Sequence, residues 1–208
     1  MPRERSGPVA GIVLAAGTSS RMGVNKMLLK LDGETILRRT VSRAVAAGLE
    51  PVLVVLGHEA ERARAELSGL ACEPVLNADY LLGITASLHA GLAKVPARSA
   101  AAVVILADMP FVTSSMIASL VDRYRQSAAP LVISDYAGVD APPMLYDRSL
   151  FSELQAMKGE GCGKQVVKRH RGEALALSWP AAALADVDVR ADYERLRAEL
   201  GEDESRGL

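Results

Sequence analysis

Three short apolar runs constrain the fold of this chain most strongly. Residues 9–14 (VAGIVL), 51–56 (PVLVVL) and 101–106 (AAVVIL) contain no charged or hydroxyl side chain. Strands that are covered by helices on both faces have this composition, because neither face contacts water. Helix-like stretches lie between the runs, and strands separated by helices predict a mainly parallel α/β sheet. We therefore expect an α/β fold, a three-layer sandwich with a mostly parallel sheet.

Hydrophobic periodicity and capping residues divide the rest of the chain into further elements. Helices are expected at 35–48, 59–67, 85–94, from Thr113 or Ser114 to about 124, and at 149–157, 164–170 and 191–200. Further strands are expected at 73–76, 130–134, 144–146 and 175–179, the last at a sheet edge. Residues 136–143 hold glycine, aspartate and two prolines, which is typical of a loop. No repeat or linker divides the chain, so one domain over 1–208 is expected, with a core at about 9–200 and a polar tail at 201–208.

The composition excludes several classes of partner. There are 24 basic and 25 acidic residues, giving a net charge of -1, so the totals show no electrostatic footprint for nucleic acid or an anionic membrane. No apolar run approaches the ~20 residues that cross a bilayer, and residues 1–8 are too polar for a signal peptide. Cys72 and Cys162 form no C-x-x-C pair, which favours free thiols, with Cys162 exposed between glycines. A soluble, cytoplasmic protein is expected, with no nucleic-acid or membrane partner.

A loop of small residues follows the first strand and carries Arg21 and Lys26. Small residues let backbone N–H groups approach phosphate oxygens, and fixed cations neutralise them. The loop is not a P-loop, because two residues separate Gly23 from Lys26. It is not a dinucleotide fingerprint either, since Gly11, Gly17 and Gly23 lie too far apart. From the residues alone, it is either another kind of phosphate loop or a flexible connection with incidental charges.

The segment 14–29, with the pattern LAAG-x3-RMG-x2-K-x-LL, resembles the signature of the sugar-phosphate-type nucleotidyltransferases. Within them it is most similar to the molybdenum cofactor cytidylyltransferases of the MobA-like NTP transferase family. Five later segments extend the resemblance over about 11–196, namely 83–92, 106–110, 141–146, 159–164 and 186–193. It implies a Rossmann-like nucleotide-diphospho-sugar transferase fold. Ala15-Ala16 and the short spacing from Gly23 to Lys26 resemble the cytidylyl branch, which implies CTP rather than GTP.

The resemblance is weakest on the side that would hold the acceptor. Glu160, Cys162 and Lys164 replace the Asp, Gly and Arg of the family pattern, and Val189-Arg190 replaces Thr-Pro. The second substrate is therefore the least constrained part of the expectation.

The expected site lies at the carboxyl ends of the strands, where open α/β sheets bind ligands. Asp108 follows the strand 101–106, and a carboxylate there suits a Mg²⁺ ion that bridges triphosphate oxygens. Asp188 is expected as the second metal ligand, and Lys26 and Arg21 as the groups that hold the phosphates. The nucleotide cradle is expected to comprise Leu14, Ala15, Ala16, Gly17, Asn77, Gly83 and Ser87.

Five of these residues also have a structural interpretation. Asp108 then caps a turn, Asp188 is an N-cap, Lys26 is a surface lysine, Arg21 closes the loop through a salt bridge, and Ser87 begins a helix. His58, His89 and His170 have no partner with metal-ligand spacing, so surface or core positions are expected for them.

The resemblance implies a Mg²⁺-dependent enzyme that transfers CMP from CTP to the terminal phosphate of a molybdopterin-type cofactor and releases pyrophosphate. A molybdoenzyme or its insertion chaperone would then be a partner. Two alternatives stay open: a nucleotidyltransferase that uses GTP or another NTP with a different phosphorylated acceptor, and a non-catalytic nucleotide- or cofactor-binding chaperone. The joint presence of Lys26, Asp108 and Asp188 favours catalysis, because binding alone needs no metal site with two carboxylates.

Overall fold

A seven-stranded sheet in the order β5-β4-β1-β6-β8-β7-β9 forms the centre of the computed structural model, which describes residues 6–20, 22–159, 161–187 and 189–199. The strands are β1 (Val9–Ala15), β4 (Val52–Leu56), β5 (Glu73–Leu76), β6 (Ala101–Leu106), β7 (Leu131–Tyr136), β8 (Val139–Asp147) and β9 (Leu175–Trp179). β8 pairs antiparallel with β6 and β7, and the other pairs of this sheet are parallel. The expected mostly parallel sheet is confirmed.

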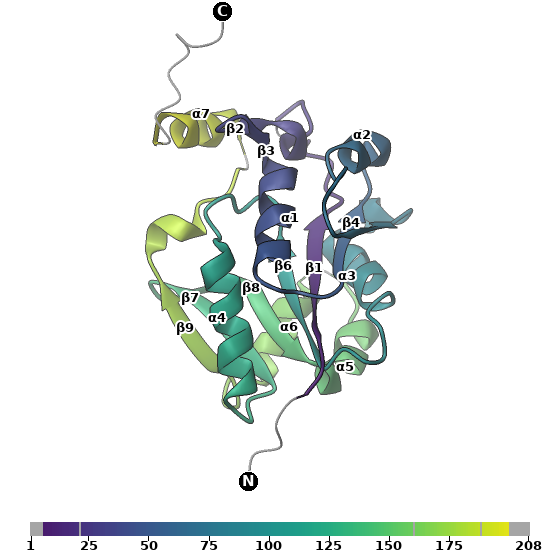
Figure 1. The fold of residues 1–208 in the computed structure, drawn as a ribbon, viewed down its shortest axis with the longest axis vertical. Coiled ribbons are helices and arrows are strands. Elements are labelled where there is room, and N and C mark those ends of the chain that lie inside the picture. The colour runs from purple at the N-terminus through teal and green to yellow at the C-terminus, as the bar shows by residue number, and fades with distance from the viewer. Residues whose placement is uncertain (1–5, 21, 160, 188, 200–208) are drawn as a thin grey trace, which may run out of the picture.

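Helices cover both faces of the sheet (Figure 1). One face packs against α1 (Ile36–Ala46), α2 (Ala60–Ala65) and α4 (Ser114–Arg125), and the other against α3 (Ile84–Leu92), α5 (Phe151–Ala156) and α6 (Cys162–Arg169). Consecutive side chains of a strand point to opposite faces, so Val13 packs in the first core and Ile12 in the second. The three-layer sandwich is confirmed.

Side-chain caps set the start of two helices, of which the cap at Thr113 was expected from the sequence. The Thr35 hydroxyl accepts a hydrogen bond from Arg38 N and begins α1, and the Thr113 hydroxyl accepts one from Met116 N and begins α4. Such side-chain acceptors satisfy N–H groups that have no partner within the helix. Gly48 follows α1 at a φ of +77°, a left-handed conformation that glycine adopts without steric cost.

The prediction for residues 136–143 is wrong. β7 and β8 form a hairpin around Ala137 and Gly138, and β8 is nine residues long rather than a short strand at 144–146. Proline has no N–H group to donate to a neighbouring strand. A stretch with two prolines therefore favours a loop when it is judged from composition. In the structure, the hydroxyls of Ser134 and Tyr136 donate to the carbonyls of Pro143 and Pro142, and the register shifts between Val132 and Ser134. These side-chain bonds hold β8 against β7 where the ladder is irregular.

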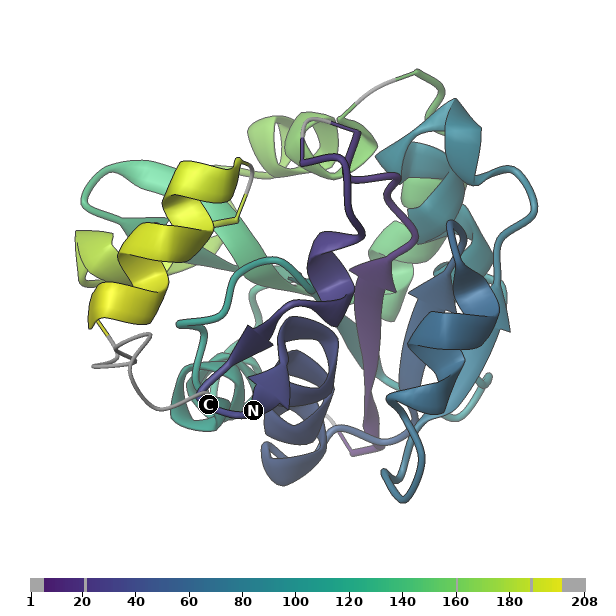
Figure 2. The ribbon, with the colours of Figure 1, turned by 90° about the horizontal axis from the view of Figure 1, so that it is seen from above.

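The last helix, α7 (Arg190–Glu199), packs on a small hairpin of β2 (Lys30–Leu31) and β3 (Glu34–Thr35). The Tyr193 hydroxyl donates to Lys30 O at 2.7 Å, and Leu196 lies against Leu31 in a separate small core. Figures 1 and 2 place α7 beside this hairpin, at the end of the sheet to which the β1 arrow points. The chain therefore builds additional structure around the carboxyl ends of the strands.

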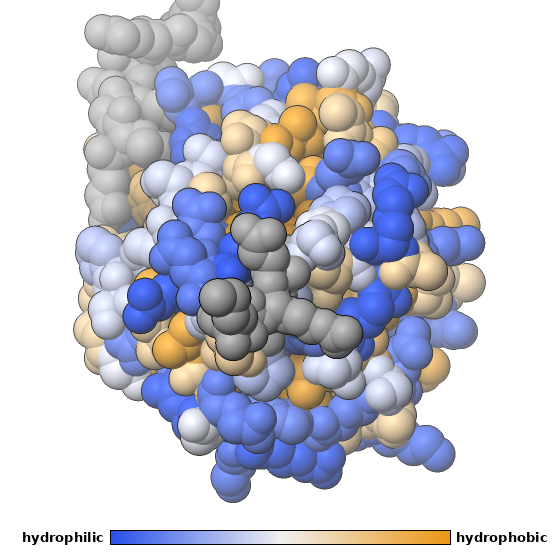
Figure 3. Space-filling model, turned by 60° about the horizontal axis from the view of Figure 1, so that its bottom comes forward, coloured by the Kyte–Doolittle hydropathy of each residue, from blue (hydrophilic) through white to orange (hydrophobic). Residues whose placement is uncertain are grey.

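The face near the amino ends of the strands is different. In Figure 3, hydrophilic side chains cover most of what is visible there, and apolar ones form small separate groups. Within the described ranges, no helix is both long and apolar enough to cross a membrane.

Candidate functional site

A cavity of about 400 Å³ opens at the carboxyl ends of β1 and β6. Its walls come from the end of β1, the loop that follows, the 3-10 helix η1 (Lys26–Leu28), the 3-10 helix η2 (Tyr80–Leu82) and the start of α3. Eight of the predicted site residues line it: Leu14, Ala15, Ala16, Gly17, Lys26, Gly83, Ser87 and Asp108. This is the position at which open α/β sheets bind ligands.

An ion pair marks one end of the cavity. Lys26 Nζ lies 2.6 Å from Asp108 Oδ2, and the two side chains are 14% and 21% exposed. β1 and β6 pair as neighbours, with Leu14 opposite Leu106, so the loops that follow both strands emerge side by side. The structure therefore excludes a solvent-exposed surface lysine at position 26 and places its cation against the predicted metal ligand.

The loop between β1 and η1 is fixed by hydrogen bonds at its far end. Lys26 N donates to Ser19 Oγ at 3.1 Å, and Asn25 Oδ1 accepts from Met27 N at 3.1 Å. Gly17 and Thr18 are exposed at the cavity, and a Cβ at Gly17 would meet nothing within 4 Å. The backbone after β1 is thus open to a ligand, which suits the approach of phosphate oxygens to N–H groups.

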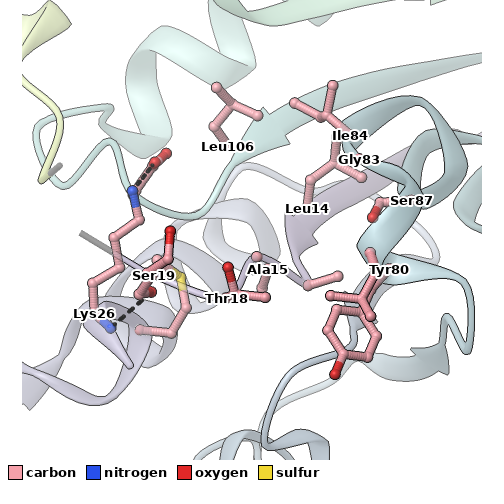
Figure 4. Close-up of a pocket in the computed structure, with 16 residues that line it drawn as sticks. Leu14, Ala15, Thr18, Ser19, Lys26, Tyr80, Gly83, Ile84, Ser87 and Leu106 are labelled. Carbon is pink, nitrogen blue, oxygen red and sulfur yellow. Dashed lines mark hydrogen bonds and ion pairs between the residues drawn. The ribbon is translucent and has the colours of Figure 1, made fainter. Parts of the chain in front are cut away.

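Ser87 and Tyr80 lie at the other end of the cavity (Figure 4). Asn77 is buried behind Ser87 and donates from Nδ2 to Ser87 Oγ at 3.1 Å. Asn77 therefore does not line the cavity with the other predicted residues. It contacts the site through Ser87.

The residue pattern missed Tyr80 and Gly57. A Cβ added to Gly57 would lie 2.5 Å from Tyr80 Cβ and 2.8 Å from Ala16 O. His58 N also donates to Ala16 O at 3.3 Å. The residues directly after β4 therefore contact both Tyr80 and the backbone at Ala16, which line different parts of the cavity. A glycine directly after an apolar strand was the available signal, because it indicates a close approach of another segment.

Two predicted site residues, Arg21 and Asp188, lie outside the described residues, as do Glu160 and the tail 201–208. Val187 N donates to Asp108 O at 3.2 Å, so the described chain just before position 188 lies at Asp108. The roles expected for Arg21 and Asp188 stay predictions.

The donor set fits a magnesium ion held jointly by protein and nucleotide. Among the described residues, no group of three or more histidine, cysteine or acidic side chains has metal-binding geometry. Mg²⁺ usually takes one or two carboxylates together with substrate phosphates. Asp108 supplies such a carboxylate at the cavity wall, beside the loop that is open to phosphate.

A charged cluster lies next to Asn25, at the end of the loop between β1 and η1. Asn25 Nδ2 donates to His58 O at 3.5 Å, and the next residue, Glu59, accepts from Arg62. The hydrogen bond from Arg62 holds the pKa of the Glu59 carboxyl below its usual value, with a smaller effect from Asn25. This cluster therefore keeps an ionised carboxylate next to Asn25.

The expectation that Cys162 is exposed is wrong. It is the first residue of α6 and is 1% exposed, because Gly161 takes a left-handed conformation that turns the helix start onto the core.

His89 and His170 have structural contacts, as expected. His89 Nε2 lies 2.8 Å from Leu154 O, and His170 Nε2 lies 2.7 Å from Glu153.

An open, mostly parallel sheet with a small-residue loop and a lysine–aspartate pair at its carboxyl edge defines a nucleotide-binding α/β enzyme domain. Residues 11–174 match the MobA-like NTP transferase domain, and the chain belongs to this family. The family expected from the sequence is therefore confirmed, and membership supports nucleotidyltransferase activity. The cytidylyl branch stays a prediction.

Individual relatives cover much of the chain. The purine catabolism protein PucB of Bacillus subtilis is 29% identical, over 93% of this chain and 98% of PucB. A probable molybdenum cofactor guanylyltransferase of Opitutus terrae is 35% identical, over 60% of this chain and 59% of its own length. The crystal structure of Rv0371c from Mycobacterium tuberculosis is 29% identical with a TM-score of 0.83, covering 92% of this chain and 98% of that one. A second Rv0371c structure is a complex with manganese, with a TM-score of 0.77, 29% identity and coverage of 93% and 99%.

Proposed function

We propose that this protein transfers CMP from CTP to the terminal phosphate of a molybdopterin-type cofactor and releases pyrophosphate. The observation that carries the proposal is the Lys26–Asp108 pair at one end of a cavity whose wall is a phosphate-type loop. A cation and a carboxylate held together beside such a loop suit a reaction in which negative charge develops on a leaving phosphate group. Binding alone would need only the loop.

Catalysis in this site consists of positioning and charge stabilisation. The backbone after β1 binds the phosphates, and Lys26 neutralises charge that builds up on the leaving pyrophosphate. An oxygen of the acceptor phosphate forms a bond to the α-phosphorus of CTP, and the bond from that phosphorus to the bridging oxygen breaks. The acceptor is an ionised phosphate monoester, so no general base is required.

Asp108 would hold the magnesium ion, with Asp188 as its proposed second protein ligand. The bound ion would supply positive charge to the triphosphate oxygens. The manganese complex of Rv0371c supports a divalent ion in a relative of this chain. The contact between Val187 and Asp108 supports a metal site to which this part of the chain contributes.

The choice of CTP rests on Ala15-Ala16 and the spacing from Gly23 to Lys26, which resemble the cytidylyl branch. GTP is the second candidate, because the Opitutus terrae relative is named a probable guanylyltransferase. That relative's name also supports the molybdenum cofactor as acceptor. A molybdoenzyme or its insertion chaperone is the proposed recipient of the product.

Pyrophosphate release tests the proposal. The protein would be mixed with Mg²⁺, molybdopterin and each of the four NTPs in turn. We expect release with CTP that depends on molybdopterin. Release with GTP but not with CTP would make guanine the base of the transferred nucleotide. No release with any of the four NTPs would overturn the proposed transfer to molybdopterin.

A further inference from the structure

The orientation of the Asn77 side chain is fixed by a backbone group. Asp79 N lies 3.0 Å from Asn77 Oδ1 and can only donate, so the amide oxygen must face it. The amide nitrogen then faces Ser87 Oγ at 3.1 Å and must donate to it. Asn77 N also donates to Leu56 O at 2.8 Å, which holds the residue at the end of β5. The network leaves one orientation for the amide.

The bond to Asn77 uses a lone pair of the Ser87 hydroxyl and leaves its hydrogen free to donate elsewhere. Its oxygen already accepts from Asn77, and both side chains are buried, with exposures of 5%. A serine in a helix often donates to the carbonyl four residues earlier. Among the described residues, Ser87 Oγ makes its hydrogen bond with Asn77. Its own hydrogen is left for a partner in the cavity, which Ser87 lines.

The two ends of the cavity differ in chemistry. Lys26 and its ion pair lie at one end, and Ser87 and Tyr80 at the other (Figure 4). If the triphosphate lies along the loop near Lys26, the base reaches the end at Ser87. This step rests on the proposed function.

We propose that Asn77 is a positioning residue that makes Ser87 a hydrogen-bond donor to the nucleobase. The site then takes the base through an acceptor atom, a ring carbonyl oxygen or an imine nitrogen. Cytosine presents both, as O2 and N3, on adjacent atoms.

Asn77→Asp reverses the polarity with little change of shape. A carboxylate still accepts from Asp79 N but cannot donate to Ser87, so the serine must donate to it. Ser87 then presents lone pairs to the base, and these face the lone pairs of the acceptor atom. We expect CTP affinity to fall at least about fivefold, the loss that accompanies an unsatisfied buried polar group.

Calorimetric titration with Mg²⁺ and CTP, GTP, UTP or ATP tests this in a double-mutant cycle. The proteins are wild type, Asn77→Asp, Ser87→Ala and the double variant, at about pH 8, where a carboxyl is normally ionised. Thermal melting checks that each is folded. We expect the Asn77→Asp loss to vanish in the Ser87→Ala background. Asn77→Ala replaces Asn77→Asp if the latter does not fold, and its smaller loss must vanish in the same background.

The outcomes separate the two proposals. The role of Asn77 is overturned, and the proposed function is not, if Asn77→Asp leaves nucleotide affinity unchanged. The same holds if Asn77→Asp lowers the affinity equally in the wild-type and Ser87→Ala backgrounds. A folded wild-type protein that binds none of the four nucleotides overturns the proposed function itself.

Discussion

Lys26 Nζ lies 2.6 Å from Asp108 Oδ2, although the two residues are 82 positions apart in the sequence. The pair forms because β1 and β6 are neighbours in the sheet and both loops leave it at the same edge. It joins the loop that is open to phosphate with the carboxylate that is proposed to hold the metal. The proposed catalysis needs both partners, and each can be removed separately.

Lys26→Met keeps the length of the side chain and removes its charge. We expect kcat to fall by about 10²- to 10³-fold, as when one group that stabilises transition-state charge is lost. Steady-state pyrophosphate release with CTP measures it. The matched control is Lys30→Met, since Lys30 is exposed on β2. Equal activities of the two variants would show that Lys26 acts only as a structural lysine.

Asp108→Asn keeps the shape of the side chain and removes the ionised ligand. We expect turnover to be lost at ordinary Mg²⁺ concentrations while the melting temperature stays near that of the wild type, because the side chain is at the cavity wall and outside the core. A Mg²⁺ titration of activity measures the effect. Asp32→Asn, at the exposed turn of the β2–β3 hairpin, is the control. Unchanged Mg²⁺ dependence in Asp108→Asn would remove this residue from the metal site.

Gly57→Ala introduces a Cβ where Tyr80 and the Ala16 carbonyl already lie. Overpacking of this kind costs about 1–3 kcal/mol of stability. We also expect a higher KM for CTP, because Tyr80 and the backbone at Ala16 line the cavity. Urea denaturation and initial rates measure the two effects. Gly172→Ala is the matched control, since no atom lies within 4 Å of its added Cβ. If both variants behave alike, the packing at Gly57 does not position the site.

Tyr136→Phe removes the hydroxyl that donates to Pro142 O at 2.9 Å. We expect the free energy of unfolding to fall by about 1 kcal/mol near neutral pH. Burial raises the pKa of Tyr136 from 10.0 to about 12. The unfolded state therefore loses its proton first as the pH rises, and the contribution that is present below pH 10 is lost toward pH 12.

Urea denaturation of wild type and Tyr136→Phe between pH 8 and pH 12, a range set by that pKa, measures this dependence. The advantage of the wild type should shrink above pH 10.0. A constant difference over the whole range would contradict the assignment.

The sequence predicted the elements whose signals are local. The strands at β1, β4 and β6 follow from continuous apolar runs, and α4 begins after Thr113, one of the two expected caps. The site residues on these segments, including Lys26 and Asp108, could be placed at one edge because parallel strands end there. These inferences need no knowledge of particular side-chain contacts.

The remaining features depend on contacts between distant segments. β8 is held by hydroxyls of β7 that bond to proline carbonyls, and a proline-containing stretch gives no local sign of this. Tyr80 enters the site because Gly57, on another segment, leaves space for it. Cys162 is buried because α6 turns onto the core at Gly161. The position of Asn77 behind Ser87 likewise depends on how β5 and α3 pack together.

The central claim is the transfer of a nucleotidyl group, and the position of a radiolabel tests it most directly. The protein would be incubated with Mg²⁺, molybdopterin and CTP labelled either at the α-phosphate or at the γ-phosphate, and the cofactor would be separated from free nucleotide. We predict that the α-label appears in the cofactor and the γ-label in pyrophosphate. If the α-label stays in CTP or free CMP while the cofactor remains unlabelled, and GTP, UTP and ATP behave in the same way, the account is contradicted.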